Sequence, residues 1–108
     1  EIVEAVDGKA EVVLDGGVQR GSDVIKAVAL GAKAVAIGKM QGWGLAAGGI
    51  EGVNRVLEIL EEEIKVAMGL MGVTSIDQLG TDYVCPADPV TMPHEMSSWV
   101  NKRDDRIL

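Results

Sequence analysis

The stretch that decides the fold is VVLDGGVQRGSDVIKAVALGAKAVAIGK, residues 12–39. Its apolar runs at 10–17 and 33–39 lack clean polar alternation, which is typical of strands buried on both faces. Between them, VIKAVALG has apolar residues at helical spacing, and Ser22 and Asp23 are candidate N-caps for this helix. Strand, helix and strand in such a short stretch predict one βαβ unit with parallel strands.

Helices are predicted on both sides of this unit. Residues 1–6 read as the end of a helix that Gly8 stops. Residues 50–72 form the longest periodic segment and predict an amphipathic helix with a continuous apolar stripe. Its glutamates, Glu58, Glu61, Glu62 and Glu63, are interpreted as a solvated face, and its methionines, Met68 and Met71, as core filler.

Two further segments have weaker patterns. GWGLAAGG, residues 42–49, is too rich in glycine for a long helix, and we expect at most one helical turn there. TSIDQLG, residues 74–80, predicts a short helix capped by Thr74 or Ser75. Residues 80–108 hold all three prolines and a charged end, and we expect an irregular tail there, distinct from a first unit at 1–79.

Both predicted strands end in glycine. Gly16 and Gly17 follow the first strand, and Gly38 and Lys39 follow the second, with Asp15 at the same end. Because ligands of parallel α/β proteins bind at the carboxyl ends of strands, the glycine amides, the amides that begin the next helix and the Lys39 ammonium predict a phosphate site. The alternative is that the glycines only make tight turns. No GxGxxG or GxxxxGK[ST] motif is present, so a Rossmann pyrophosphate site or a P-loop is not supported.

Composition narrows the class of protein. The 108 residues are 47% hydrophobic and carry a formal net charge of −7, which argues against nucleic acid or an anionic membrane as a partner. No apolar stretch approaches the roughly 20 residues that span a bilayer. The single cysteine, Cys85, excludes an internal disulfide framework, and we expect a reducing, cytoplasmic setting.

Two parallel strands that are buried on both faces cannot form a stable sheet alone. No later segment of this sequence has the pattern of another strand, and the aromatic side chains that fill small cores are scarce. We therefore expect an α/β segment whose sheet is incomplete on its own. The missing strands would belong to a longer polypeptide or to another chain.

The same residues carry a family resemblance. DGGVQRGSDVIKAVALGAKAVAIGK, followed by GWGLAAGGIEGVNRVLEILEEEIKVAMGLMGVTSIDQL, resembles the C-terminal part of the FMN-dependent α-hydroxy-acid oxidases and dehydrogenases. That family includes glycolate oxidase, lactate oxidase and mandelate dehydrogenase. The resemblance runs from about Glu1 to Leu79, with all of its motifs in order, and does not extend into the proline-rich tail.

The resemblance implies strands seven and eight of a TIM (β/α)8 barrel, with FMN as cofactor and a small (S)-2-hydroxy acid as substrate. Its first FMN loop matches Asp15, Gly16, Gly17, Val18 and Gln19, and its second loop matches Gly38 and Lys39. It places the catalytic histidine upstream of these residues, in the remainder of the barrel. No metal site is expected, and we expect a homo-oligomer.

This sequence departs from the family pattern at two charged contacts. The family usually has arginine where Gln19 stands, and Gly-Arg-Pro where Gly38, Lys39 and Met40 stand. Bidentate guanidinium contacts to phosphate would thus become one amide and one point charge, with Arg20 as a possible substitute. FMN binding is implied, with a weaker or rearranged set of contacts.

Two residues in the tail are candidate functional groups. The only histidine, His94, is interpreted as a surface or interface residue, and Cys85 as structural, since no basic neighbour activates its thiol. Two alternatives to the oxidase remain open. One is another FMN- or phosphate-binding barrel, such as a flavin-type isopentenyl-diphosphate isomerase or an IMP dehydrogenase. The other is a non-catalytic half-barrel that pairs with a partner chain.

Overall fold

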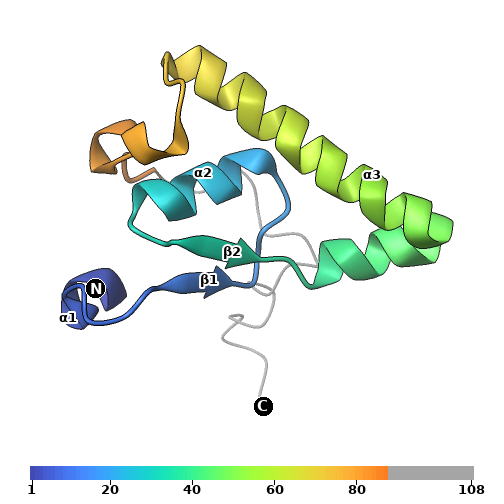
Figure 1. Cartoon of the computed structure of the whole chain (residues 1–108), viewed down its shortest axis with the longest axis horizontal. Coiled ribbons are helices and arrows are strands. Elements are labelled where there is room, and N and C mark those ends of the chain that lie inside the picture. The colour runs from blue at the N-terminus through green and yellow to red at the C-terminus, as the bar shows by residue number, and fades with distance from the viewer. Residues whose placement is uncertain (88–108) are drawn as a thin grey trace.

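The computed structural model describes residues 1–87. In chain order the elements are α1 (Ile2–Val6), β1 (Val13–Asp15), α2 (Gly21–Ala29), β2 (Ala34–Ala36), α3 (Lys39–Met71) and two short 3-10 helices, η1 (Ile76–Gln78) and η2 (Thr81–Tyr83). The βαβ unit predicted from the sequence is confirmed. Its strands pair in parallel, with Val13 opposite Ala34 and Asp15 opposite Ala36. Figure 1 shows α2 between this two-stranded sheet and the long arm of α3.

The apolar strands are not buried within the described residues. Val13 is 58% exposed and Leu14 is 40% exposed, although α2 contacts β2. The prediction that both strands are doubly buried is therefore not met by residues 1–87. The physical reason is that these residues supply one layer of helices and no further strand. The sheet is incomplete on its own, as expected.

Helix α2 begins at Gly21, with Arg20 as the residue before it. Arg20 is the N-cap, so the prediction that Ser22 or Asp23 caps this helix is wrong. Asp23 lies in the first turn, and its Oδ2 accepts hydrogen bonds from the amides of Gln19 (3.1 Å) and Arg20 (3.0 Å). The carboxylate thus satisfies amides at the start of the helix from inside its first turn, where an acidic side chain is favourable.

Helix α3 has a sharp bend at Gly48 and Gly49, and Gly49 has a φ of 60°. Residues before the bend are helical from Lys39 onward, so the expectation of a single turn in 42–49 is wrong. The bend folds the short arm back onto the long arm (Figure 1). A Cβ on Gly52 would collide with the carbonyl oxygen of Gly44, so the two backbones are in direct contact. Glycine here permits close packing of two helical arms.

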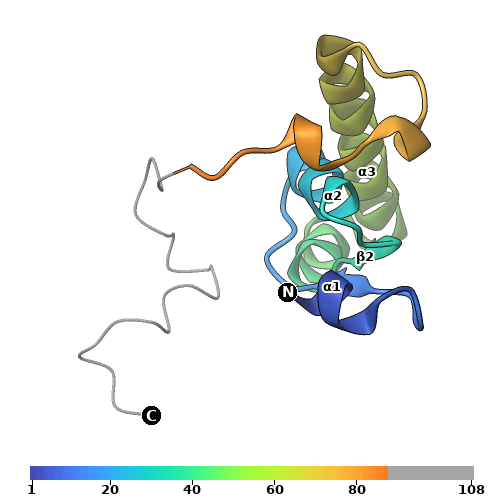
Figure 2. The same ribbon diagram turned by 90° about the vertical axis from the view of Figure 1, so that its left-hand side faces the viewer.

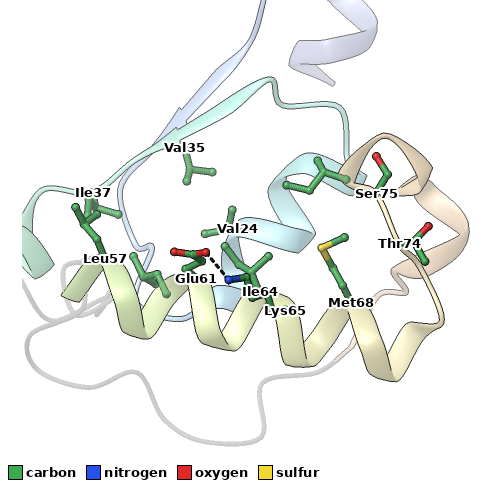
Figure 3. Close-up of a pocket in the computed structure, with 12 residues that line it drawn as sticks. Val24, Val35, Ile37, Leu57, Glu61, Ile64, Lys65, Met68, Thr74 and Ser75 are labelled. Atoms are coloured by element: carbon green, nitrogen blue, oxygen red, sulfur yellow. Dashed lines mark ion pairs between the residues drawn. The ribbon is translucent and has the colours of Figure 1, made fainter. Parts of the chain in front are cut away.

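The apolar stripe of α3 lines a hollow of about 570 Å3 between α2, β2 and the long arm (Figure 3). Leu60 is buried, whereas Leu57 remains half exposed. Two charged side chains at its edge, Glu61 and Lys65, form an ion pair with each other. Most of the surface of this hollow is apolar, and the charge of Lys65 is paired with Glu61, so the hollow is a poor site for a phosphate.

After α3 the chain turns back, and η2 contacts α2 (Figure 2). Ser75 caps η1 by accepting a hydrogen bond from the Asp77 amide, which confirms one of the two predicted caps. The predicted irregular tail begins with η2, and its larger part, including His94, lies outside the described residues. Within residues 1–87 no helix has the length and apolar character required to cross a bilayer.

Candidate phosphate site at the strand ends

The carboxyl ends of β1 and β2 meet at one edge of the sheet. Asp15, the last residue of β1, pairs with Ala36, the last residue of β2. Gly16 and Gly17 therefore begin a loop beside the one that leads through Gly38 into α3 (Figure 1). The structure thus brings together the two glycine-containing loops that the sequence predicted as one site.

Three glycines face open space at this edge. Gly16 (φ 96°) and Gly17 (φ 75°) lie in the left-handed region, which residues with side chains rarely adopt, and a Cβ on either would have no atom of residues 1–87 within 4 Å. Gly38 has a φ of −102°, and a Cβ there would also meet no described atom within 4 Å. Neither conformation nor packing within residues 1–87 requires glycine at position 38. A close approach by a ligand or by another part of the protein is a physical reason for it.

The N-terminus of α3 also faces this edge. The first hydrogen bond of this helix runs from the Gly42 amide to the Gly38 carbonyl oxygen, 3.1 Å long. The amides of the first turn, from Lys39 to Gln41, precede that bond and have no acceptor inside the helix. They form the positive end of the helix dipole, and the exposed Lys39 adds a full charge there. This arrangement favours an anion.

The N-terminus of α2 differs, because carboxylates already occupy its amides. Asp23 accepts from Gln19 and Arg20, and Glu63 Oε2 accepts from the Gly21 amide at 2.7 Å. In the structure these three amides therefore already have acceptors, and we do not include them among the proposed phosphate contacts. Two negative side chains fill the place where an anion would have to lie.

Glu63 is the feature that sequence reasoning missed. Its Oε1 lies 2.7 Å from Nη2 of Arg20, so the guanidinium proposed as a substitute phosphate ligand is held in an ion pair. The hydrogen bond from the Gly21 amide, followed by that from Arg20, lowers the pKa of Glu63 below its usual value. Because Gly21 and Glu63 are 42 positions apart, no local pattern in the sequence could indicate their contact.

The remaining predicted site residues have different environments. Val18 is buried, with 6% exposure, so only its backbone could reach a ligand. The side chains of Asp15 and Gln19 are exposed beside the loop. Contact between any of these residues and FMN stays a prediction. Among the described residues, no group of three or more His, Cys, Asp or Glu side chains could hold a metal ion, and Cys85 is an exposed free thiol.

The geometry defines a parallel α/β unit with two glycine-containing loops at its strand ends, and sequence comparison gives the family. Residues 1–86 match the family described as FMN-dependent dehydrogenase. The chain belongs to this family. The match continues past Leu79, the residue at which the resemblance in the sequence motifs ends.

Individual relatives agree with this assignment. The chain is 52% identical over 84 residues to an L-lactate oxidase of Nostoc sp. (78% of this chain, 23% of the relative). It is 60% identical over 76 residues to 2-hydroxyacid oxidase 1 of Homo sapiens (70% and 20%). The chain thus spans less than a quarter of the length of these relatives.

Solved structures give the same result at the level of the fold. An (S)-mandelate dehydrogenase structure superposes with a TM-score of 0.71 at 40% identity, covering 76% of this chain and 24% of that one. A flavocytochrome b2 variant superposes with a TM-score of 0.73 at 37% identity, covering 99% and 29%. In both cases this chain matches a segment of a larger flavoprotein.

Proposed function

We propose that this segment binds the phosphate end of FMN in an enzyme that oxidises a small (S)-2-hydroxy acid to a 2-oxo acid. The observation that carries the proposal is the shared edge at which a Cβ on Gly16, on Gly17 or on Gly38, the residue before α3, would meet no described atom within 4 Å. A phosphate group fits this edge, because it is an anion small enough to approach backbone amides without side chains in the way.

The family assignment supplies the rest of the proposal. FMN stands in the name of the family, and L-lactate oxidase and 2-hydroxyacid oxidase 1 are named for hydroxy acids. We assign β1 and β2 to the last two strands of a TIM barrel and α3 to its last helix. The preceding strands would cover Val13 and Leu14, which are exposed here.

In this assignment the residues of this chain bind and orient the cofactor. The amides of the Gly16–Gly17 loop and of the first turn of α3 donate hydrogen bonds to the phosphate, and Lys39 supplies the positive charge. Bound FMN would supply the two-electron oxidation chemistry. Removal of the substrate's α-proton is assigned to a histidine upstream of these residues, as the family resemblance implies.

The decisive experiment is the visible spectrum of the full-length protein. A yellow protein whose flavin absorbance bleaches anaerobically with glycolate, lactate or mandelate supports both the cofactor and the reaction class. A colourless protein that takes up no FMN would indicate a non-catalytic half-barrel and overturn the proposal. If the protein binds FMN but no hydroxy acid reduces it, the proposed cofactor stands and the proposed substrate class is overturned.

Lys39 and Gln19 should contribute unequally to FMN affinity. Lys39→Ala removes a full charge at the N-terminus of α3, and we expect the dissociation constant for FMN to rise by about tenfold. Gln19→Ala removes a neutral, exposed amide and should raise it by less than about threefold. Quenching of flavin fluorescence by the apo-protein measures both. Equal and negligible changes would mean that the glycine amides hold the phosphate without side chains.

Two further properties are proposals of the same kind. We propose that the full-length protein is a homo-oligomer and that it is cytoplasmic, a compartment that the single cysteine favours. Light scattering of the full-length protein would test the first, and fractionation of the source cells would test the second.

A further inference from the structure

We propose that Glu63 is a positioning residue that fixes the first FMN loop in place by holding Arg20 and Gly21. The inference rests on the proposed function, because the loop matters only if it binds the cofactor phosphate. Both carboxylate oxygens are used: Oε2 accepts from the Gly21 amide at 2.7 Å, and Oε1 pairs with Nη2 of Arg20 at 2.7 Å. Both contacts join α3 to the end of the loop that begins at Gly16.

The packing around Glu63 leaves little freedom for this contact. A Cβ added to Gly21 would lie 2.6 Å from Cβ of Glu63 and 2.6 Å from the Ile64 amide nitrogen, so the start of α2 rests directly on α3. The Glu63 side chain is only 24% exposed. A charged side chain in this position is ordered by the two donors it binds and restrains them in return.

The loop is therefore fixed at both ends. Its first end follows Asp15, which is held in the sheet by pairing with Ala36. Its second end is held by Glu63, and only a few residues separate the two. Helix α3 itself begins at Lys39, the second half of the candidate site. Lys39 lies on the short arm of α3 and Glu63 on the long arm, and the two arms are in direct contact at Gly44 and Gly52. The long arm thus supports the short arm and also holds the first loop, so the spacing of the two halves of the site depends on Glu63.

The neighbouring glutamates do not have this geometry. Glu58 and Glu62 pair with Arg55, and Glu61 pairs with Lys65, all within α3. The side chain of Glu62 is 64% exposed and reaches no other element through these contacts. Glu62 is therefore a matched control for Glu63: it is the same residue type, on the same helix, one position away.

The test compares FMN and riboflavin binding to the full-length apo-protein, because only FMN has the phosphate. Glu63→Gln keeps an acceptor for the Gly21 amide and removes the charge that holds Arg20. We expect this variant to bind FMN about tenfold more weakly, with riboflavin affinity unchanged, and Glu62→Gln to match the parent for both ligands. Arg20→Gln should reproduce the loss and add little to it in the double variant.

Three outcomes would overturn the inference. Unchanged FMN affinity in Glu63→Gln would mean that FMN binding by the loop does not depend on the contacts of Glu63. Higher affinity would mean that the released Arg20 binds phosphate and that Glu63 restrains it from doing so. Equal losses for FMN and riboflavin would indicate a general structural role. If Glu63→Gln does not fold, Arg20→Gln tests the same ion pair from its exposed side.

Failure of the proposed function is distinguishable from failure of the inference. If the parent protein binds no FMN, the proposed function is wrong. The contacts of Glu63 with Arg20 and Gly21 are then tested by amide hydrogen exchange. Glu63→Ala removes the acceptor of the Gly21 amide, so faster exchange at Gly21 in this variant, with no change in Glu62→Ala, would support the inference as a structural fact. Unchanged exchange at Gly21 would overturn it.

Discussion

Replacing Gly52 with alanine is expected to lower the free energy of unfolding by about 3 kcal/mol. The added methyl group would collide with the carbonyl oxygen of Gly44. Backbone cannot rotate away as a long side chain can, so the two helical arms of α3 would have to separate. Because the short arm begins at Lys39, their separation would also displace the N-terminus of α3 from the candidate site.

Gly69→Ala is the matched control for this prediction. Gly69 lies in the same helix, and a Cβ there would meet nothing within 4 Å among the described residues. Alanine is favoured over glycine in a helix by about 0.5–1 kcal/mol, so this variant should be neutral or more stable. Denaturant unfolding of the full-length protein measures both variants. Equal midpoints for Gly52→Ala and the parent would show that the arms adjust without cost.

The features that the sequence predicted correctly are those with a local pattern. Apolar runs ending in glycine gave the two strands, helical spacing gave α2, and parallel strands placed the two glycine-containing loops at one edge of the sheet. Parallel pairing followed from the short crossover alone. Each of these conclusions depends on residues within a few positions of each other, where periodicity and backbone preference are informative.

The features that it missed depend on contacts between distant residues. Nothing near Glu63 in the chain distinguishes it from Glu62, yet one holds Arg20 and Gly21 while the other pairs along its own helix. In the same way, the glycines of 42–49 indicated at most one helical turn, whereas the chain is helical from Lys39 to the bend at Gly48. Gly44 and Gly52 allow the two helical arms to pack together. A low helix propensity was outweighed by packing that propensity does not describe.

Gly38→Ala is expected to weaken FMN binding with little change in the stability of the apo-protein. Its φ of −102° is accessible to alanine, and a Cβ there meets no atom of the part of the chain that the structure describes within 4 Å. The stability of the apo-protein should therefore change by less than about 1 kcal/mol. If the phosphate of FMN approaches this backbone, the same methyl group would push it away. We expect the dissociation constant for FMN to rise by at least about tenfold, with riboflavin affinity unchanged.

Gly17→Ala provides the contrasting variant. Gly17 has a φ of 75°, so alanine there is strained by about 1–2 kcal/mol whether or not a ligand binds. Both stability and FMN affinity should therefore fall in Gly17→Ala, whereas only affinity should fall in Gly38→Ala. The opposite pattern, with Gly38→Ala unstable and its FMN affinity intact, would mean that protein rather than phosphate contacts position 38. The glycine would then serve barrel packing, and the phosphate site would have to lie at the Gly16–Gly17 loop alone.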